Sequence, residues 1–296
     1  MTDDIRTELY LNHEDILGLN FIRDPGVYLY RRHYRAGLRS HLMEILDPED
    51  VEKEKKGIII DGLRWFPRAK PLKMLRIFRM KFNGLREAEK ELMRVKIIAA
   101  YLAPGYIARS EEFLVDYKLH RKHELLLCGL QELIEGEILD PWRHPDRSHL
   151  VCLFQRFGFE KGEDHDMIID RWIRKIRSKA EIFIEKLKRM ILEANYIPDL
   201  AGVGNLLITR SGDIKLVDIN NISRVSFGVT INLDDRGYPV CDKSIEALSL
   251  LEQTLLGRSI DRKGVIYKIF LDAKRMEEVK ALEKEFHTSM EPAGYA

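Results

Sequence analysis

Residues 196–221 constrain the fold of this chain more than any other stretch. They read Tyr-Ile-Pro-Asp-Leu-Ala-Gly-Val-Gly-Asn-Leu-Leu-Ile-Thr-Arg-Ser-Gly-Asp-Ile-Lys-Leu-Val-Asp-Ile-Asn-Asn. The apolar runs on either side of residues 209–213 predict two short strands, and the Ser-Gly pair between them is a turn signal. A hairpin of this length returns the chain beside its start, so we expect the side chains of Asn205 and Asp218 to converge. One amide oxygen and one carboxylate suit Mg²⁺, which prefers hard oxygen ligands.

This arrangement resembles the protein-kinase superfamily, including its small-molecule kinases. In that family an acidic residue and an Asn of the catalytic loop precede a hairpin, which a metal-binding Asp follows. Asp199, Asn205 and Asp218 stand in this order, and the thirteen-residue step from Asn205 to Asp218 is the one protein kinases show. The resemblance implies that Asn205 and Asp218 hold Mg²⁺ and that Asp199 orients or deprotonates an acceptor hydroxyl.

Two further stretches fall in the order the family shows. Residues 125–139 resemble the strand and hinge that seat adenine, where Glu132 and Leu133 would offer backbone groups and Gly136 would relax the linker. Residues 240–257 resemble the helix that opens with a structural aspartate, here Asp242, and anchors the catalytic loop. Asp242 is also suited to cap that helix. The resemblance covers roughly residues 58–257.

The catalytic loop departs from the family pattern. Ile197-Pro198 replaces the His-Arg that usually precedes the acid, and Asp199 stands six residues before Asn205 instead of five. Asp218 is followed by Ile219-Asn220 rather than Phe-Gly, so Asn220 offers a second metal contact. These differences put the role of Asp199 as a base in doubt.

The nucleotide-binding half departs as well. No Gly-x-Gly-x-x-Gly loop is present, so any cover over the phosphates is built differently. Arg76 stands where the family has a strand lysine, and the two residues are not interchangeable, although the positive charge is kept. Its expected partner is Glu91 on the following helix, with Glu87 as a weaker candidate.

The predicted fold is α+β and bilobal. Residues 1–57 have no clear structure, 58–136 form a strand-rich lobe with one helix, and 137–296 form a mainly helical lobe. Apolar periodicity predicts helices over 85–102, 166–195 and 245–256, and short apolar runs predict strands over 72–78, 113–115 and 125–133. In the first segment, residues 27–30 resemble a strand and 42–46 part of a helix.

The amino-acid composition limits the kinds of binding partner that we expect for this chain. The 49 basic and 48 acidic side chains give a net charge of +1, so no overall charge favours nucleic acid or an anionic membrane. The same balance argues against an all-helical nucleic-acid binder. No apolar run approaches the ~18 residues of a membrane-spanning helix, the first residues do not resemble a signal peptide, and nothing indicates an oligomer.

Three scattered cysteines favour a reducing cytoplasm over a disulfide framework or a cysteine-based zinc site. His144 and His149 are expected to be exposed loop residues, because no metal-ligand spacing surrounds them.

Each candidate residue also has an ordinary structural interpretation. Asp218 is able to cap a turn, Pro198-Asp199 before a glycine-rich loop is good turn chemistry, and Arg76 with Glu91 is consistent with a surface ion pair. Asn205 is a candidate metal ligand only because of its spacing to Asp218.

The resemblance implies transfer of the γ-phosphoryl group of ATP, with Mg²⁺, to an acceptor hydroxyl. The sequence does not name the acceptor. The short segment between Asp218 and Pro239 leaves no room for a long activation segment and favours a small molecule. The alternative is a pseudokinase that acts as a nucleotide-binding or scaffold protein. The missing glycine loop, the Arg for Lys and the altered catalytic loop favour it, and the retained Asp199, Asn205 and Asp218 oppose it.

Overall fold

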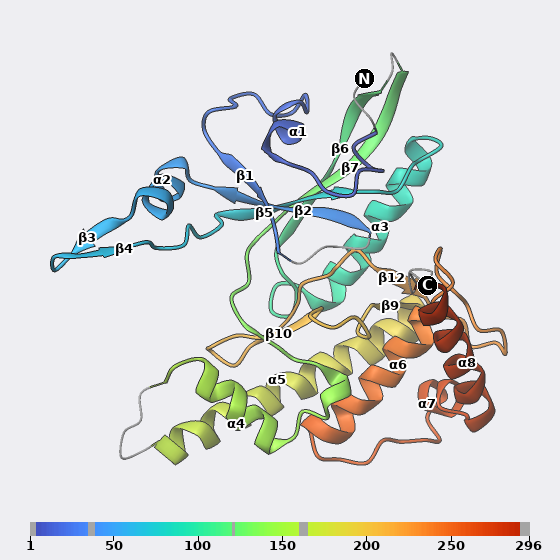
Figure 1. The fold of residues 1–296 in the computed structure, drawn as a ribbon. Coiled ribbons are helices and arrows are strands. Elements are labelled where there is room, and N and C mark those ends of the chain that lie inside the picture. The colour runs from blue at the N-terminus through green and yellow to red at the C-terminus, as the bar shows by residue number, and fades with distance from the viewer. Residues whose placement is uncertain (1–3, 35–38, 120–121, 160–164, 291–296) are drawn as a thin grey trace, which may run out of the picture. The chain divides into compact units, whose positions relative to one another are not determined.

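The computed structural model describes residues 4–34, 39–119, 122–159 and 165–290, and it is a mixed α+β structure with a strand-rich N-terminal part and a helical C-terminal part (Figure 1). The chain divides into two compact units. Unit 1 comprises residues 1–93 and 108–133, and unit 2 comprises residues 94–107 and 134–296. Residues 1–57, for which the sequence indicated no clear structure, are part of unit 1.

Unit 1 is built on an antiparallel five-stranded sheet in the order β1-β2-β5-β7-β6. Its strands are β1 (Leu29–Arg32), β2 (Ser40–Leu46), β5 (Lys73–Phe78), β6 (Ser110–Leu119) and β7 (Lys122–Gln131). The expected helix at Leu42–Leu46 is wrong, because these residues lie in β2. Nearly every residue of β2 is buried, so the strand lacks the alternation of apolar and polar residues that marks a half-buried strand.

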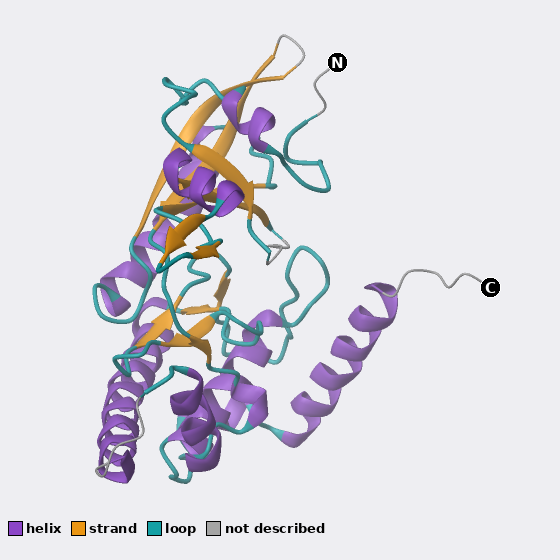
Figure 2. Cartoon of the chain, turned by 60° about the vertical axis from the view of Figure 1, so that its left-hand side comes forward, coloured by secondary structure: helices purple, strands orange, loops and turns teal. Residues whose placement is uncertain are grey.

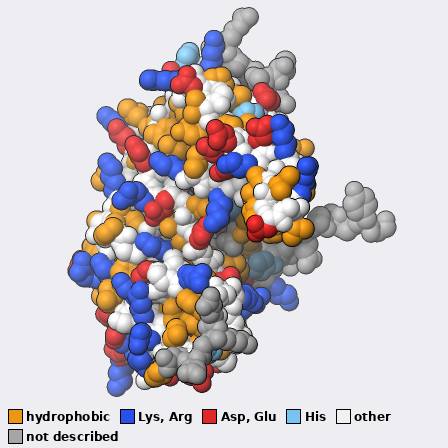
Figure 3. Space-filling model, turned by 90° about the vertical axis from the view of Figure 1, so that its left-hand side faces the viewer, with side chains coloured by type: hydrophobic (Ala, Val, Ile, Leu, Met, Phe, Trp, Pro, Cys, Tyr) orange, Lys and Arg blue, Asp and Glu red, His pale blue; other side chains and the backbone are white. Residues whose placement is uncertain are grey.

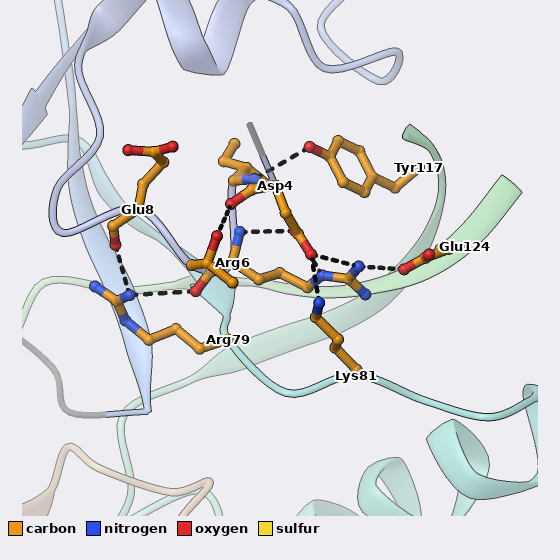
Figure 4. Close-up of polar contacts among 9 residues, drawn as sticks. Asp4, Arg6, Glu8, Arg79, Lys81, Tyr117 and Glu124 are labelled. Atoms are coloured by element: carbon orange, nitrogen blue, oxygen red, sulfur yellow. Dashed lines mark hydrogen bonds and ion pairs between the residues drawn. The ribbon is translucent and has the colours of Figure 1, made fainter. Parts of the chain in front are cut away.

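The N-terminal segment is fixed to this sheet by polar contacts, which Figure 4 shows. The Arg6 side chain is 1% exposed and pairs with Asp4 at 2.8 Å and with Glu124 of β7. Arg79 donates to the backbone oxygens of Arg6 and Glu8 at 3.2 and 2.6 Å. These charged contacts add to the burial of Ile5 and Leu11 from the same segment in the apolar core of unit 1. The short helix α1 (His13–Leu17) follows, with Asn12 as its N-cap.

A helix and a two-stranded hairpin separate β2 from β5. Helix α2 (Pro48–Lys56) has Asp47 as its N-cap and Pro48 in its first turn, both typical of helix starts. The hairpin of β3 (Ile58–Ile60) and β4 (Leu63–Trp65) turns at Asp61-Gly62, and both turn residues have positive φ. This is the Asp-Gly pair that tight hairpin turns favour.

Helix α3 (Leu85–Leu102) has the bounds predicted from its apolar spacing; its first half belongs to unit 1 and its second half to unit 2. The helices that follow α3 in the described ranges lie in unit 2. They are α4 (Arg147–Arg156), α5 (His165–Ala194), α6 (Val240–Leu250), α7 (Val265–Phe270) and α8 (Ala273–Met290), with a 3₁₀ turn at Pro141–Arg143 and a π-helical turn at Leu251–Leu255 that continues α6.

Helix α5 buries one continuous face, from Ile169 to Ile191, in the main apolar core of unit 2. The π-helical turn that ends α6 packs against it. Gly257, in the left-handed region at φ 67°, follows this turn, in the position where glycine commonly ends a helix. No helix in the part of the chain that the structure describes is long and apolar enough to span a membrane.

In the described part of unit 2, five short strands lie among these helices, and strands of this part are seen as small orange arrows in Figure 2. Strands β8 (Glu137–Ile138), β10 (Leu206–Ile208) and β11 (Ile214–Leu216) form one antiparallel sheet, with β10 in the centre. Strands β9 (Tyr196–Pro198) and β12 (Ile222–Arg224) pair antiparallel in a second sheet. The predicted hairpin of residues 205–217 is therefore present, and the chain on either side of it is joined by a pairing that the sequence did not reveal.

Candidate functional site

Asp199 directly follows β9 and is held by both neighbouring segments. Its N–H donates to the backbone oxygen of Asn221 at 2.8 Å, which extends the β9–β12 pairing by one residue. Its Oδ1 accepts the N–H groups of Ala201 and Gly202 at 2.9 and 3.1 Å, and its Oδ2 accepts the side-chain amide of Asn221 at 2.8 Å. The carboxylate is buried yet receives three hydrogen bonds, so its orientation is fixed.

Asn205 and Asp218 are placed by the β10–β11 hairpin. The Nδ2 of Asn205 donates to the backbone oxygen of Asp199 at 2.9 Å, so the amide oxygen points away from that bond. The backbone oxygen of Asn205 accepts the N–H of Val217 at 2.8 Å, which brings the two ends of the hairpin together. Asn205 and Asp218 therefore start from adjacent backbone positions, and the convergence of their side chains stays a prediction.

Gly202 makes this geometry sterically possible. A Cβ at this position would lie 2.5 Å from the Nδ2 of Asn205 and 3.0 Å from its Cγ. Contacts this short do not occur, so any larger residue would displace the Asn205 amide. The glycine-rich composition of the loop thus has a specific cause, which is the close approach of Asn205 to the backbone.

The electrostatics of the two acids are coupled. Burial raises the pKa of the Asp199 carboxyl above its ordinary value, and the nearby charge of Asp218 raises it further. The hydrogen bonds from Gly202, Ala201 and Asn221 act in the opposite direction. The charge of Asp218 thus acts on the Asp199 carboxyl in the same direction as burial.

Asn220 and Asn221 follow Asp218 and have different surroundings. The amide of Asn221 supports Asp199, a role that the sequence did not suggest. Both amide atoms of Asn220 are shielded from solvent and have no hydrogen-bond partner among the described residues. Because shielding a polar amide without a partner is costly, Asn220 remains a candidate for a second ligand contact.

Two residues from other elements hold the loop in position, and a third lies near it. The N–H of Leu200 donates to the hydroxyl of Ser244 on α6 at 3.2 Å, and the indole Nε1 of Trp142 donates to the backbone oxygen of Ala201 at 2.9 Å. Burial and the charge of Glu283 raise the pKa of the Tyr238 hydroxyl. The charge of Asp199 raises the same pKa further. None of these contacts has a signal in the sequence, because each joins segments far apart along the chain.

Asp242 has a different partner from the one expected. It forms a buried bidentate ion pair with Arg275 at the start of α8, at 2.5 and 3.1 Å, and Arg275 also donates to the backbone oxygen of Gly228 at 2.9 Å. The expectation that Asp242 caps α6 is wrong, since the N-cap is Pro239 and no side chain caps this helix. The contact between α6 and the loop comes from Ser244.

In unit 1, Arg76 is buried in the middle of β5. It donates to the Oε1 of Gln131 on the neighbouring strand β7 at 3.3 Å, and its guanidinium lies 5.5 Å from the ring centre of Phe78. Glu91 lies on α3 and is half-buried. The weaker candidate, Glu87, accepts the backbone and side-chain N–H groups of Asn83 at 2.8 and 3.0 Å, which is a local contact at the start of α3.

Glu132 and Leu133 follow β7 at the end of unit 1. The N–H of Glu132 donates to the backbone oxygen of Arg109 at 2.9 Å, and its carboxylate accepts the Arg109 N–H at 2.7 Å. The backbone oxygen is therefore the group of Glu132 that is left to hydrogen-bond an adenine. Gly136 belongs to unit 2, where a Cβ would lie 2.6 Å from the backbone oxygen of Ile208. Close packing against β10, rather than linker flexibility, accounts for this glycine.

The donor set of the loop fits a magnesium ion by its chemistry. Asn205 and Asp218 supply an amide oxygen and a carboxylate, which are hard oxygen ligands, and such sites complete the shell with phosphate and water oxygens. Within the described ranges, no group of three or more His, Cys, Asp and Glu side chains is arranged to hold a metal. The expected magnesium site is not a group of this kind, because its two protein ligands are one amide, Asn205, and one carboxylate, Asp218.

One curated protein resembles part of this chain, namely the siroheme decarboxylase NirH subunit of Pseudomonas aeruginosa. The two are 31% identical over 139 residues, which covers 79% of that protein. The chain belongs to the same family as this subunit. The match covers 43% of the chain, so more than half of the chain has no counterpart in it. No protein-family model matches the chain, and the expected kinase family remains a proposal.

Proposed function

We propose that this chain is a bilobal, kinase-like phosphotransferase that moves the γ-phosphoryl group of ATP to the hydroxyl of an unidentified acceptor. One observation carries the proposal: the hairpin joins Asn205 and Asp218 at its two ends, and Asn205 donates to the backbone of Asp199, whose buried carboxylate accepts three hydrogen bonds. An acid, an amide and a second acid in this order are the polar groups that phosphoryl transfer from ATP requires.

Bound Mg²⁺ would neutralise charge on the phosphates. Asn205 and Asp218 would hold it, with the Asn205 amide oriented by its bond to the backbone of Asp199. Gly202 leaves the space for this orientation. The buried amide of Asn220 is the nearest candidate in sequence for an additional contact.

Asp199 would orient the acceptor hydroxyl and accept its proton. An ionised carboxylate has about four lone-pair sites, and three of those on Asp199 are taken by Ala201, Gly202 and Asn221. The remaining site suits a single hydroxyl donor. A raised pKa also makes this carboxylate a better base than an exposed one.

Unit 1 would supply the nucleotide contacts. Arg76 would bind phosphate with its guanidinium, and Glu91 would orient it. The backbone of Glu132 and Leu133 would contact adenine, with Glu132 limited to its carbonyl. This half rests on the strand-rich fold of unit 1 and on the positive charge of Arg76 in the middle of β5.

In the pseudokinase alternative the same residues form the site, but the protein does not transfer a phosphoryl group. It is favoured by the absence of a Gly-x-Gly-x-x-Gly sequence and by Arg76 in place of lysine. It predicts binding of ATP, or no binding, with no phosphoryl transfer to any acceptor or to water.

A thermal-shift titration with ATP, with and without Mg²⁺, tests the proposal, followed by turnover assays with a panel of small alcohols. At a ligand concentration 100 times Kd, binding should stabilise the fold by about 2.7 kcal/mol. Asp218→Ala should lose most of this stabilisation. Asp213→Ala, which removes a carboxylate from the turn of the same hairpin, should keep it.

Asp199→Asn separates the enzyme from the pseudokinase. It should bind ATP with Mg²⁺ normally and lose turnover by about 10²- to 10⁴-fold, the usual contribution of a general base. The metal assignment fails if ATP and Mg²⁺ give no shift at millimolar concentration. The enzyme assignment fails if binding is tight and no acceptor, including water, is phosphorylated.

The sequence match favours a second candidate, a role in siroheme metabolism. The matched relative is named as a siroheme decarboxylase subunit. Titration of the chain with siroheme, followed by absorbance, tests this candidate directly. Saturable binding of siroheme without any effect of ATP would favour it over phosphoryl transfer.

A further inference from the structure

The β3–β4 hairpin of unit 1 exposes large apolar side chains. The exposed fractions are 70% for Ile59, 51% for Ile60, 75% for Leu63, 61% for Trp65 and 56% for Phe66. A two-stranded hairpin is marginally stable by itself in water, and contiguous exposed apolar groups mark interaction sites. Figure 3 looks onto the face that carries this hairpin and shows hydrophobic side chains bordered by basic ones.

The apolar groups lie on both faces of the hairpin. Ile58 pairs with Trp65 and Ile60 with Leu63, so these side chains share one face. Ile59, opposite Arg64, lies on the other face. The second face is therefore mixed, with Ile59 beside Arg64, whereas the face of Ile60, Leu63 and Trp65 is apolar and exposed.

The charge around the hairpin differs from that of the chain as a whole. From Lys53 to Lys73 there are seven basic and two acidic residues, whereas the complete chain has a net charge of only +1. Three of the seven pair with acids outside this stretch, namely Lys53 with Asp50, Lys56 with Glu52 and Arg68 with Glu44. Of the two acids, Glu54 pairs with Arg31 at 2.8 Å, and Asp61 lies in the exposed turn. The surface that complements this hairpin is therefore both apolar and anionic.

We propose that the β3–β4 hairpin is an interfacial anchor for membranes that contain anionic lipids. The face that carries Ile60, Leu63 and Trp65 would enter the interface to the ~5–10 Å depth that the apolar face of a peripheral anchor reaches. Trp65 and Phe66 lie at the base, where aromatic side chains suit the headgroup level. The hairpin would lie obliquely, so that Asp61 stays near the headgroups while Ile60 and Leu63 enter the lipid.

Co-sedimentation of the full chain with vesicles tests this anchor. Binding to phosphatidylcholine vesicles that contain phosphatidylglycerol should be at least tenfold stronger than binding to phosphatidylcholine alone, because each basic residue near an anionic surface adds attraction. The double variant Ile60→Ser, Leu63→Ser should weaken binding by about tenfold or more. Val229→Ser, which alters an apolar residue exposed by 95% in unit 2, is the matched control and should bind as the wild type.

Tryptophan fluorescence gives an independent readout. Emission should shift to the blue on mixing with the anionic vesicles, and Trp65→Phe should abolish the shift while binding persists, since Trp142 and Trp172 are at most partly exposed. Equal binding to both vesicle types, or unchanged binding of the double variant, would overturn the proposal. So would a concentration-dependent dimer that the double variant abolishes, which would make a second copy the occupant.

Discussion

Gly202 allows the arrangement of the candidate metal ligands to be tested without removing either ligand. In Gly202→Ala the added Cβ would lie 2.5 Å from the Asn205 Nδ2. This atom is the end of a side chain, so the amide should rotate away while the backbone keeps its course. The rotation breaks the 2.9 Å bond to the backbone of Asp199. Loss of one such hydrogen bond should lower the free energy of unfolding by about 1 kcal/mol.

The effect on nucleotide binding should be larger than the effect on stability. Misorienting a metal ligand typically weakens metal binding by ~10- to 100-fold. A tenfold loss would reduce the stabilisation by ATP and Mg²⁺ from about 2.7 to about 1.4 kcal/mol at the same ligand concentration. Thermal shifts with and without Mg²⁺ measure this difference, and urea unfolding measures the change in the apo protein.

Gly105→Ala is the matched control, since a Cβ there has no neighbour within 4 Å, and it should behave as the wild type in both assays. If Gly202→Ala keeps the full magnesium-dependent shift, Asn205 is not a ligand. If it unfolds with a loss of several kcal/mol, the loop backbone has moved and the steric argument is wrong.

Three further predictions concern stability. Gly136→Ala places a Cβ 2.6 Å from a backbone oxygen of β10, which cannot move as a side chain can, and should cost about 1–3 kcal/mol in urea unfolding. Arg6→Met should cost about 3 kcal/mol because it breaks a buried charge network, whereas Lys81→Met, at a 59% exposed partner of Asp4, should cost less than about 1 kcal/mol. Burial and Asp218 raise the pKa of Asp199, so the folded state holds this proton more tightly and wild-type stability should fall as pH rises from about 4 through the raised pKa. Asp199→Asn should remove that part of the pH dependence; an unchanged slope of urea midpoint against pH would contradict it.

The sequence determined the elements whose signal is local. Residues 85–102 and 166–195 predict α3 and α5 to within one residue of their ends, because a long apolar stripe at helical spacing has no other stable solution. The hairpin that joins Asn205 to Asp218 was also predicted, since turn residues and apolar runs lie within a few positions of one another.

Tertiary structure decided what depends on distant segments. Strand β2 is buried almost throughout and carries no alternation, so only its pairing with β1 and β5 makes it a strand. The support of Asp199 by Asn221 and of Leu200 by Ser244 arises from the β9–β12 pairing and from the packing of α6. The pairing of Asp242 with Arg275 likewise joins residues far apart in the chain. The polar residues of the site were thus visible in the sequence, whereas their partners were fixed by packing between segments that no local pattern relates.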